Sequence, residues 1–130
     1  MSDETISILV VDDDPNNVDI VQTYLESKGY QVTTAANGKE ALAKLESARP
    51  KVVLLDVMMP GMDGWEVARV IKNHPDFAKC RVVMLTARSD FMDKQEGLRA
   101  GADDFIVKPV RLEDLGQRVE QNLQALGRTA

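Results

Sequence analysis

The sequence is poor in the side chains that form disulfides and soft-metal sites. Its 130 residues contain one cysteine, Cys80, and one histidine, His74. A single cysteine excludes an internal disulfide and is typical of a protein from a reducing cytoplasm. His74 falls on a loop and Cys80 opens a predicted strand, so the two do not support a zinc site. We therefore expect a cytoplasmic protein without disulfides.

Long apolar runs and an excess of positive charge are also missing. No apolar run approaches the roughly 20 residues that a membrane helix needs, and the acidic start at residues 1–5 lacks the pattern of a signal peptide. The 16 lysines and arginines are outnumbered by 21 aspartates and glutamates, which gives a formal net charge of −5. These features argue against a membrane partner and against direct nucleic-acid binding by this chain.

The remaining composition is that of an ordinary globular protein. Apolar residues make up 44% of the chain and charged residues 28%. A length of 130 residues is normal for one domain that buries a real core. We therefore expect a single domain over residues 1–130, with its folded core over about residues 6–126.

The stretch Lys51–Asp56 is the most informative in the chain. Four apolar residues, 52–55, lead into the single carboxylate of Asp56. A short continuous apolar run of this kind is typical of a strand buried on both faces of a parallel sheet. The proline and glycines of 57–64 delay the next helix until Gly64 or Trp65. Asp56 is therefore predicted at the carboxyl end of a central strand, the edge where ligands bind in open α/β sheets.

Strands and helices alternate along the whole chain. Apolar and β-branched runs predict strands, and apolar residues at intervals of three and four predict helices between them. The predicted strands cover residues 6–11, 30–36, 51–56, 81–85 and 105–107. This alternation predicts an α/β protein with a flavodoxin-like, doubly wound (βα)5 parallel sheet. The first and third strands are the most apolar and hence central, which favours the order 2-1-3-4-5.

The helices carry their own signals. Asp14 is expected to cap the first helix, with Pro15 at its first position. The third helix is expected to bury Val67, Val70 and Ile71. A fourth helix is expected between residues 89 and 101, and a fifth over 112–126.

Charged and hydroxyl side chains follow four of the predicted strands. Because the carboxyl ends of parallel strands open on one side, these side chains are expected to share one crevice. They are Asp12, Asp13 and Asp14 after the first strand, Asp56 after the third, Thr86 after the fourth and Lys108 after the fifth.

Close carboxylates raise each other's pKa, and a hard divalent cation relieves that repulsion. Mg²⁺ is typically held by one or two carboxylates together with waters and phosphate oxygens. Asp13 and Asp56 are the predicted side-chain ligands, with Asp12 acting through a bound water. The backbone carbonyl of Met58 is the best placed further ligand.

The same crevice suits phosphoryl transfer. A carboxylate such as Asp56 can act as a covalent nucleophile and form an aspartyl-phosphate. Lys108 supplies a mobile positive charge suited to a phosphate oxygen, and Thr86 supplies a hydroxyl donor. The residues therefore predict Mg²⁺-dependent phosphorylation of Asp56.

Five segments in register resemble the receiver domain of two-component response regulators, a CheY-like superfamily. No single segment would be sufficient, but the five together span nearly the whole chain. They are Val10–Asp14, Asp56–Gly64, Met84–Ala87, Gly101–Phe105 and Lys108-Pro109.

The resemblance implies a signalling switch that catalyses only its own phosphorylation and dephosphorylation. A sensor histidine kinase or a histidine phosphotransfer protein would donate the phosphoryl group to Asp56. Thr86 would then move toward the phosphate and the aromatic ring of Phe105 would turn inward. The family also commonly has a cis peptide where this chain has Lys108-Pro109.

The resemblance places the readout surface on the fourth helix, the fifth strand and the fifth helix, where a partner or an output domain would bind. A homodimer favoured by phosphorylation is a further expectation. Opposite charges for such an interface are offered by Arg99, Asp103, Asp104 and Arg118.

Other functions and simpler roles compete with this interpretation. A Mg²⁺-dependent phosphohydrolase of the haloacid dehalogenase type would use an Asp-x-Asp motif, which Asp12 and Asp14 match, but its usual cap domain is missing. A flavin-binding domain is disfavoured because the acidic turn would repel the flavin phosphate. Trp65 and the nearby methionines are expected to serve packing, and His74 is expected to be exposed.

Overall fold

Five parallel strands form one sheet in the computed structural model, which describes residues 6–57, 64–86, 101–108 and 110–128. The strand order is β2-β1-β3-β4-β5, as the apolar pattern predicted. The strands are β1 (Ser7–Val11), β2 (Gln31–Ala35), β3 (Val52–Asp56), β4 (Arg81–Thr86) and β5 (Asp104–Val107). The predicted α/β, flavodoxin-like architecture is therefore confirmed.

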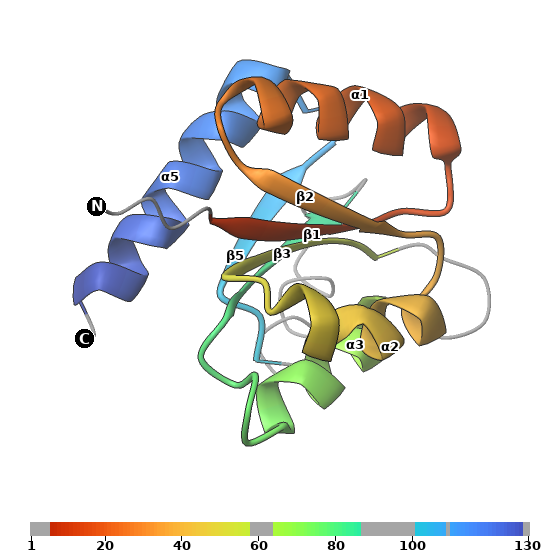
Figure 1. The fold of residues 1–130 in the computed structure, drawn as a ribbon, viewed down its shortest axis with the longest axis vertical. Coiled ribbons are helices and arrows are strands. Elements are labelled where there is room, and N and C mark those ends of the chain that lie inside the picture. The colour runs from red at the N-terminus through yellow and green to blue at the C-terminus, as the bar shows by residue number, and fades with distance from the viewer. Residues whose placement is uncertain (1–5, 58–63, 87–100, 109, 129–130) are drawn as a thin grey trace.

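Helices cover both faces of the sheet. Figure 1 shows α1 and α5 on one face and α2 and α3 on the other. The described helices are α1 (Pro15–Ser27), α2 (Gly38–Ala48), α3 (Gly64–Asn73) and α5 (Leu112–Arg128). The helix expected between residues 89 and 101 lies outside the described residues. Among the described helices, none has the length and apolar character needed to cross a lipid bilayer.

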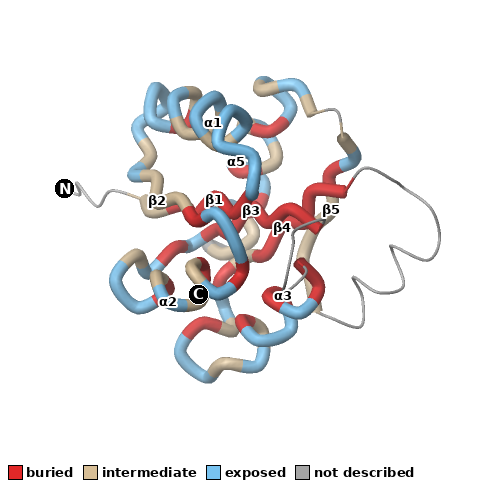
Figure 2. Tube along the Cα trace, turned by 90° about the vertical axis from the view of Figure 1, so that its right-hand side faces the viewer, coloured by how far each residue is buried: buried red, intermediate tan, exposed pale blue. Residues whose placement is uncertain are grey.

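The central strands are almost free of solvent contact. All five residues of β3 are buried, as are the last four of β1 and the last five of β4 (Figure 2). One apolar cluster fills the space under α2 and α3, and a second fills the space under α1 and α5. Because both faces of these strands are covered, their sequences run as continuous apolar stretches without alternation.

Side-chain caps fix where α1 and α2 begin. The Oδ1 atom of Asp14 accepts the N–H of Asn16 at 3.0 Å, and Pro15 is the first residue of α1, so the predicted cap is confirmed. At α2, Asn37 Oδ1 accepts the N–H of Glu40 at 2.8 Å. These caps start both helices close to the carboxyl edge of the sheet.

One detail of the helices differs from the sequence expectation. Val70 is 43% exposed, so its assignment to the buried face of α3 was wrong; Trp65 and Ala68 are buried there instead. The last residue of α2 is Ala48, and its C-cap residue, Arg49, adopts a left-handed conformation with φ of 44° just before Pro50. A residue before proline is disfavoured in the right-handed helical region, which explains why the helix ends there.

Candidate functional site

Three carboxylates converge at the carboxyl ends of β1 and β3. Asp56 is the last residue of β3, and Asp12 follows β1 directly. Val11 and Leu55 are partners in the parallel register, so Asp12 and Asp56 come from neighbouring strand ends. One carboxylate oxygen from each of Asp12, Asp13 and Asp56 lies within 4.8 Å of the other two. The convergence expected from the strand order is therefore present.

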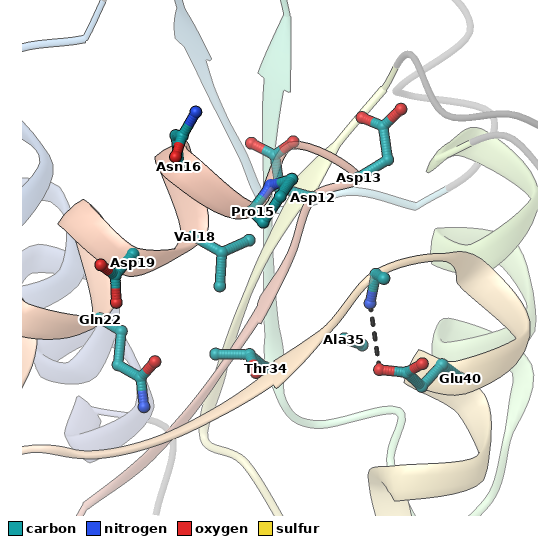
Figure 3. A pocket seen from close by; sticks show the side chains of 11 residues that line it. Asp12, Asp13, Pro15, Asn16, Val18, Asp19, Gln22, Thr34, Ala35 and Glu40 are labelled. Atoms are coloured by element: carbon teal, nitrogen blue, oxygen red, sulfur yellow. Dashed lines mark hydrogen bonds between the residues drawn. The ribbon is translucent and has the colours of Figure 1, made fainter.

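The three carboxylates differ in exposure. Asp12 and Asp56 are buried, whereas Asp13 is exposed. The N–H of Asp12 donates to the carbonyl of Ala35 at 3.1 Å, and its Oδ1 accepts the N–H of Asp14 at 2.9 Å. These bonds fix Asp12 at the junction of β1 and α1 (Figure 3). Asp13 is the carboxylate of the three that is most open to solvent.

Burial raises the pKa of Asp12 above its ordinary value of 3.8. The negative charge of Asp56 and a hydrogen bond shared with it raise this pKa further, while the N–H of Asp14 and the charge of Lys108 oppose the rise. A divalent cation would offset the cost of gathering these charges. Carboxylate oxygens are the ligands that Mg²⁺ prefers in proteins. The donor set of Asp12, Asp13 and Asp56 therefore fits a hard divalent cation.

Lys108 brings a positive charge to the same place. Its Nζ lies 3.0 Å from Asp56 Oδ1, in an ion pair whose lysine side chain is 31% exposed and whose aspartate side chain is 5% exposed. The N–H of Lys108 donates to the carbonyl of Thr86 at 2.7 Å, which ties the end of β5 to the end of β4. The backbone hydrogen bond and the ion pair together hold the ammonium group of Lys108 against the buried carboxylate of Asp56.

Thr86 is buried at the last position of β4. Asp56 is the register partner of Leu85, so Thr86 lies one residue further toward the carboxyl edge. The N–H of Val57 donates to the carbonyl of Leu85 at 3.0 Å, which keeps the ends of β3 and β4 together. The structure thus brings Asp56, Lys108 and Thr86 to one edge, where a phosphoryl group could be bound and its charge neutralised.

Phe105 lies on β5, with its half-buried ring packed against the cluster under α2 and α3. Its N–H donates to Asp104 Oδ1 at 2.8 Å, and its carbonyl accepts from Arg118 Nη1 at 2.8 Å. Arg118 also forms an ion pair with Asp104 at 2.8 Å. Helix α5 therefore holds the backbone of Phe105 through these two charged side chains.

The charges suggested for a homodimer interface already have partners within the chain. Asp104 pairs with Arg118, and Asp103 Oδ2 lies 2.9 Å from Lys72 Nζ. Any interface that uses Asp103, Asp104 or Arg118 must share or exchange these bonds. Arg99 lies outside the described residues, as do the carbonyl of Met58 and the Lys108-Pro109 peptide, so those expectations stay predictions.

Gly64 and Trp65 have a closer relation to the site than the sequence suggested. A Cβ atom on Gly64 would lie 2.8 Å from the Cα of Val57 and would also collide with the backbone of Asp56. The ring of Trp65 contacts the ring of Phe105, with centroids 6.3 Å apart. From the sequence, Gly64 was expected to delay the helix and to end one of the five resembling segments, and Trp65 was expected to serve packing. Gly64, which follows Asp56 closely in the sequence, was the available signal for this contact.

Cys80 and His74 lie away from the carboxylates. Burial raises the pKa of the Cys80 thiol to about 11. His74 is half-buried and not exposed as expected, because its ring packs on Phe77 at 4.7 Å and its Nδ1 accepts the N–H of Asp76. Neither residue joins a metal site within the part of the chain that the structure describes.

Two grooves open beside the carboxylates. The first, of about 630 Å³, lies between α1 and the start of α2 and is lined by polar residues that include Asp13, Asn16, Asp19, Gln22 and Glu40 (Figure 3). The second, of about 580 Å³, lies between α1 and α5 and is mainly apolar. It is lined by Ile20, Val21, Val110, Leu112 and Leu115, together with Asp12 and Lys108.

The family model for the response regulator receiver domain matches residues 8–120. The DNA-binding response regulator MtrA of Mycolicibacterium smegmatis is 39% identical over 117 residues, which are 90% of this chain and 50% of that protein. The alkaline phosphatase synthesis transcriptional regulatory protein PhoP of Bacillus subtilis is 41% identical over 117 residues, which are 90% of this chain and 48% of that protein.

A solved structure of a CheY-like response regulator receiver domain protein from Methanospirillum hungatei is also similar. It matches with a TM-score of 0.91 and 31% identity, over 98% of this chain and all of the other. The chain spans about half the length of the curated relatives it matches. The similarity therefore covers the sheet and the carboxylate site described above.

Proposed function

The chain belongs to the response regulator receiver domain family of two-component signalling, and on that premise we propose that Asp56 is its phosphoacceptor. The family implies a histidine kinase as partner. We propose that this kinase, or a histidine phosphotransfer protein, supplies the phosphoryl group as a phosphohistidine. The protein then acts as a switch that turns over only its own phosphate.

One observation carries the proposal. The buried carboxylate of Asp56 forms a 3.0 Å ion pair with Lys108 Nζ and lies within 4.8 Å of carboxylate oxygens from Asp12 and Asp13. A solitary buried carboxylate would be costly, whereas one set between a cation and a potential metal site is poised to carry a phosphoryl group. The phosphohydrolase alternative loses support because Asp14, the second aspartate of its motif, caps α1.

The proposed transfer is a displacement at phosphorus. A carboxylate oxygen of Asp56 forms the new O–P bond while the P–N bond of the phosphohistidine breaks. The electron pair of the broken bond remains on the imidazole nitrogen. Lys108 neutralises charge on the phosphoryl oxygens, and the hydroxyl of Thr86 donates a hydrogen bond to one of them.

Asp12, Asp13 and Asp56 would hold Mg²⁺, with the carbonyl of Met58 as an expected further ligand. When bound, the cation would neutralise charge on the acceptor and on the phosphoryl oxygens. In its absence the carboxylates of this chain keep the site acidic and disfavour the approach of a phosphate. We therefore expect phosphorylation to require the metal.

We further propose that phosphorylation is read out on the face formed by β5 and α5, together with the expected fourth helix. Thr86 and Lys108 are joined by a backbone hydrogen bond of 2.7 Å. Movement of Thr86 toward a phosphate would therefore displace the end of β5 directly. The ring of Phe105 would follow, and a partner, an output domain or a second copy of the chain would bind the altered face.

The apolar groove between α1 and α5 fits the phosphodonor. It is lined by Asp12 and Lys108 as well as by apolar side chains, so it is continuous with the acceptor site. Ile20, on its α1 wall, is 54% exposed. A helix carrying the phosphohistidine could cover these apolar groups and present its imidazole to Asp56.

Intact-protein mass spectrometry after incubation with Mg²⁺ and acetyl phosphate tests the acceptor. We expect a phosphate-sized increment, labile to hydroxylamine, in wild type and not in Asp56→Asn. Asp19→Asn, an exposed carboxylate of the polar groove, is the matched control and should be phosphorylated as wild type is. An increment that persists in Asp56→Asn would show that another residue is the acceptor.

Ile20→Ser tests the phosphodonor groove. Transfer from the cognate phosphorylated kinase should slow by about tenfold, because apolar contact at the groove is lost, while phosphorylation by acetyl phosphate should be unchanged. Val70→Ser, which alters an exposed apolar residue on α3, serves as control. Equal rates of transfer from the kinase to Ile20→Ser and to Val70→Ser would refute the docking proposal.

A further inference from the structure

Trp65, the only tryptophan of the chain, is anchored to the acceptor strand. It is 8% exposed and lies in the first turn of α3. The preceding residue, Gly64, donates its N–H to the carbonyl of Val57 at 3.0 Å, and Val57 follows Asp56 directly. The close approach of Gly64 to the backbone of Asp56 leaves no room for a side chain there. The position of Trp65 is therefore set by the acceptor strand.

The indole ring of Trp65 contacts the aromatic side chain that is expected to turn inward on phosphorylation. Its centroid lies 6.3 Å from that of Phe105, with the ring planes tilted by 55°. This separation and tilt fall within the favourable range for aromatic pairs. Both rings belong to the apolar cluster beneath α2 and α3, where Phe105 is only partly covered. Trp65 thus forms a wall of the site in which the ring of Phe105 is seated.

The other end of this contact leads to α5. The carbonyl of Phe105 accepts from Arg118 at 2.8 Å, and its N–H donates to Asp104, which also pairs with Arg118. A continuous set of contacts therefore runs from the backbone beside Asp56 through Trp65 and Phe105 to α5. This set does not pass through Thr86.

We propose that Trp65 is a positioning residue for the ring of Phe105. It favours the inward position of that ring, packed against the apolar cluster under α2 and α3, and so couples α3 to the β5–α5 face. The inference rests on the proposed function, because it assigns a cause to the position of the proposed switch residue. Removal of the indole leaves the acceptor chemistry in place but makes the inward position less favourable. The activated state then becomes harder to reach.

Beryllofluoride, which mimics the phosphoryl group on an aspartate, measures this directly. A ligand that favours one conformation binds more weakly when that conformation is less populated. Loss of one aromatic contact changes such an equilibrium by about two- to twelvefold. We therefore expect Trp65→Leu to weaken the apparent affinity for beryllofluoride, at fixed Mg²⁺, by about that factor, as followed by NMR of the amides of β5 and α5.

Three variants separate this role from packing alone. Trp65→Phe should restore most of the affinity, because it keeps an aromatic ring against Phe105. Ile71→Val, on the same buried face of α3, should lower stability without changing the affinity. In a double-mutant cycle, Trp65→Leu should have little further effect once Phe105→Leu is present, because both act through one contact.

Unchanged affinity in Trp65→Leu, or additive effects in the cycle, would overturn the inference. Mass spectrometry with acetyl phosphate keeps it distinct from the proposed function, because Trp65→Leu should still be phosphorylated on Asp56. If wild type accepts phosphate but Trp65→Leu binds beryllofluoride normally, only the inference fails. If wild type neither accepts phosphate nor binds beryllofluoride, the proposed function fails and the inference falls with it.

Discussion

At the scale of single residues, Asp12 imposes a cost on the fold. Its carboxyl group is buried beside Asp56, which raises its pKa above 3.8. The native state therefore holds this proton more tightly than the unfolded state does. As pH rises above 3.8 toward the raised value, the unfolded state loses its proton first, so the stability that the protonated group contributes is lost across that window.

Asp12→Asn should relieve this cost. Without Mg²⁺ at neutral pH, the variant should be more stable than wild type by about 1–3 kcal/mol, because a neutral amide avoids both the burial of a charge and its repulsion by Asp56. Its free energy of unfolding should also fall less steeply with pH. Urea titrations at several pH values measure both effects. Identical pH profiles for the two proteins would contradict the prediction.

Gly64→Ala should damage the acceptor loop. The added methyl group would meet the backbone of Asp56 and Val57, so we expect a loss of about 1–3 kcal/mol in unfolding free energy and slower phosphorylation by acetyl phosphate. Gly29→Ala is the control, because Gly29 has a φ of 95° but no atoms within 4 Å of a new Cβ. That variant should lose about 1 kcal/mol through backbone strain alone and keep its phosphorylation rate.

At the scale of elements, α5 is joined to the edge of the sheet by one buried amide. Asn122 is 2% exposed. Its Oδ1 accepts from Arg81 Nε at 3.0 Å, and its Nδ2 donates to Asp104 Oδ2 at 3.1 Å and to the carbonyl of Arg118 at 2.8 Å. A polar side chain in the apolar stripe of a helix is tolerated because all of its groups are satisfied.

Asn122→Ala should therefore lower the unfolding free energy by about 2–3 kcal/mol, since it removes the three hydrogen bonds of this buried amide. Gln121→Ala, at the exposed neighbouring position, should change stability by less than about 0.5 kcal/mol. Denaturation in urea, followed by circular dichroism, gives both values. A loss in Asn122→Ala no larger than in Gln121→Ala would show that the amide contributes nothing to stability.

The elements themselves were largely predictable from the sequence, for a physical reason. Strands such as β1 and β3 are covered on both faces, and their sequences are therefore continuous apolar runs that can be recognised without the structure. Local capping by Asp14 and Pro15 was predictable because it depends on neighbours in the chain. Val70 was misassigned because an apolar side chain can lie on the exposed side of a helix at little cost.

At the scale of the whole molecule, local stability should be highest in the central strands of the sheet and lower at its edges. Residues such as Leu9 and Leu54 lie on central strands and are fully buried, whereas β2 is an edge strand with partly exposed side chains. We expect amide hydrogen exchange of Leu54 to require global unfolding, and that of Thr33 in β2 to be faster by at least about tenfold. Equal protection of the two strands would contradict this.

The carboxylate site also follows from the whole molecule, because a parallel sheet brings its strand ends to one edge whatever their distance along the chain. Strand order and residue type were therefore enough to predict that Asp12, Asp56 and Lys108 would meet. The contact between Trp65 and Phe105 was not predictable in this way. It depends on how the first turn of α3, which follows β3, packs against β5, two strands away from β3 in the sheet. Nothing in either local sequence specifies that packing.

The hydrogen bonds from Asp104 and Arg118 to the backbone of Phe105 also affect whether the protein aggregates at high concentration. β5 ends the sheet, and the open side of an end strand can recruit a strand from another molecule and start aggregation. At Phe105 the donor and the acceptor that such a strand would need are already occupied by Asp104 and Arg118. The ion pair of Asp104 and Arg118, which links α5 to β5, therefore also keeps this edge of the sheet from pairing with a strand of another molecule.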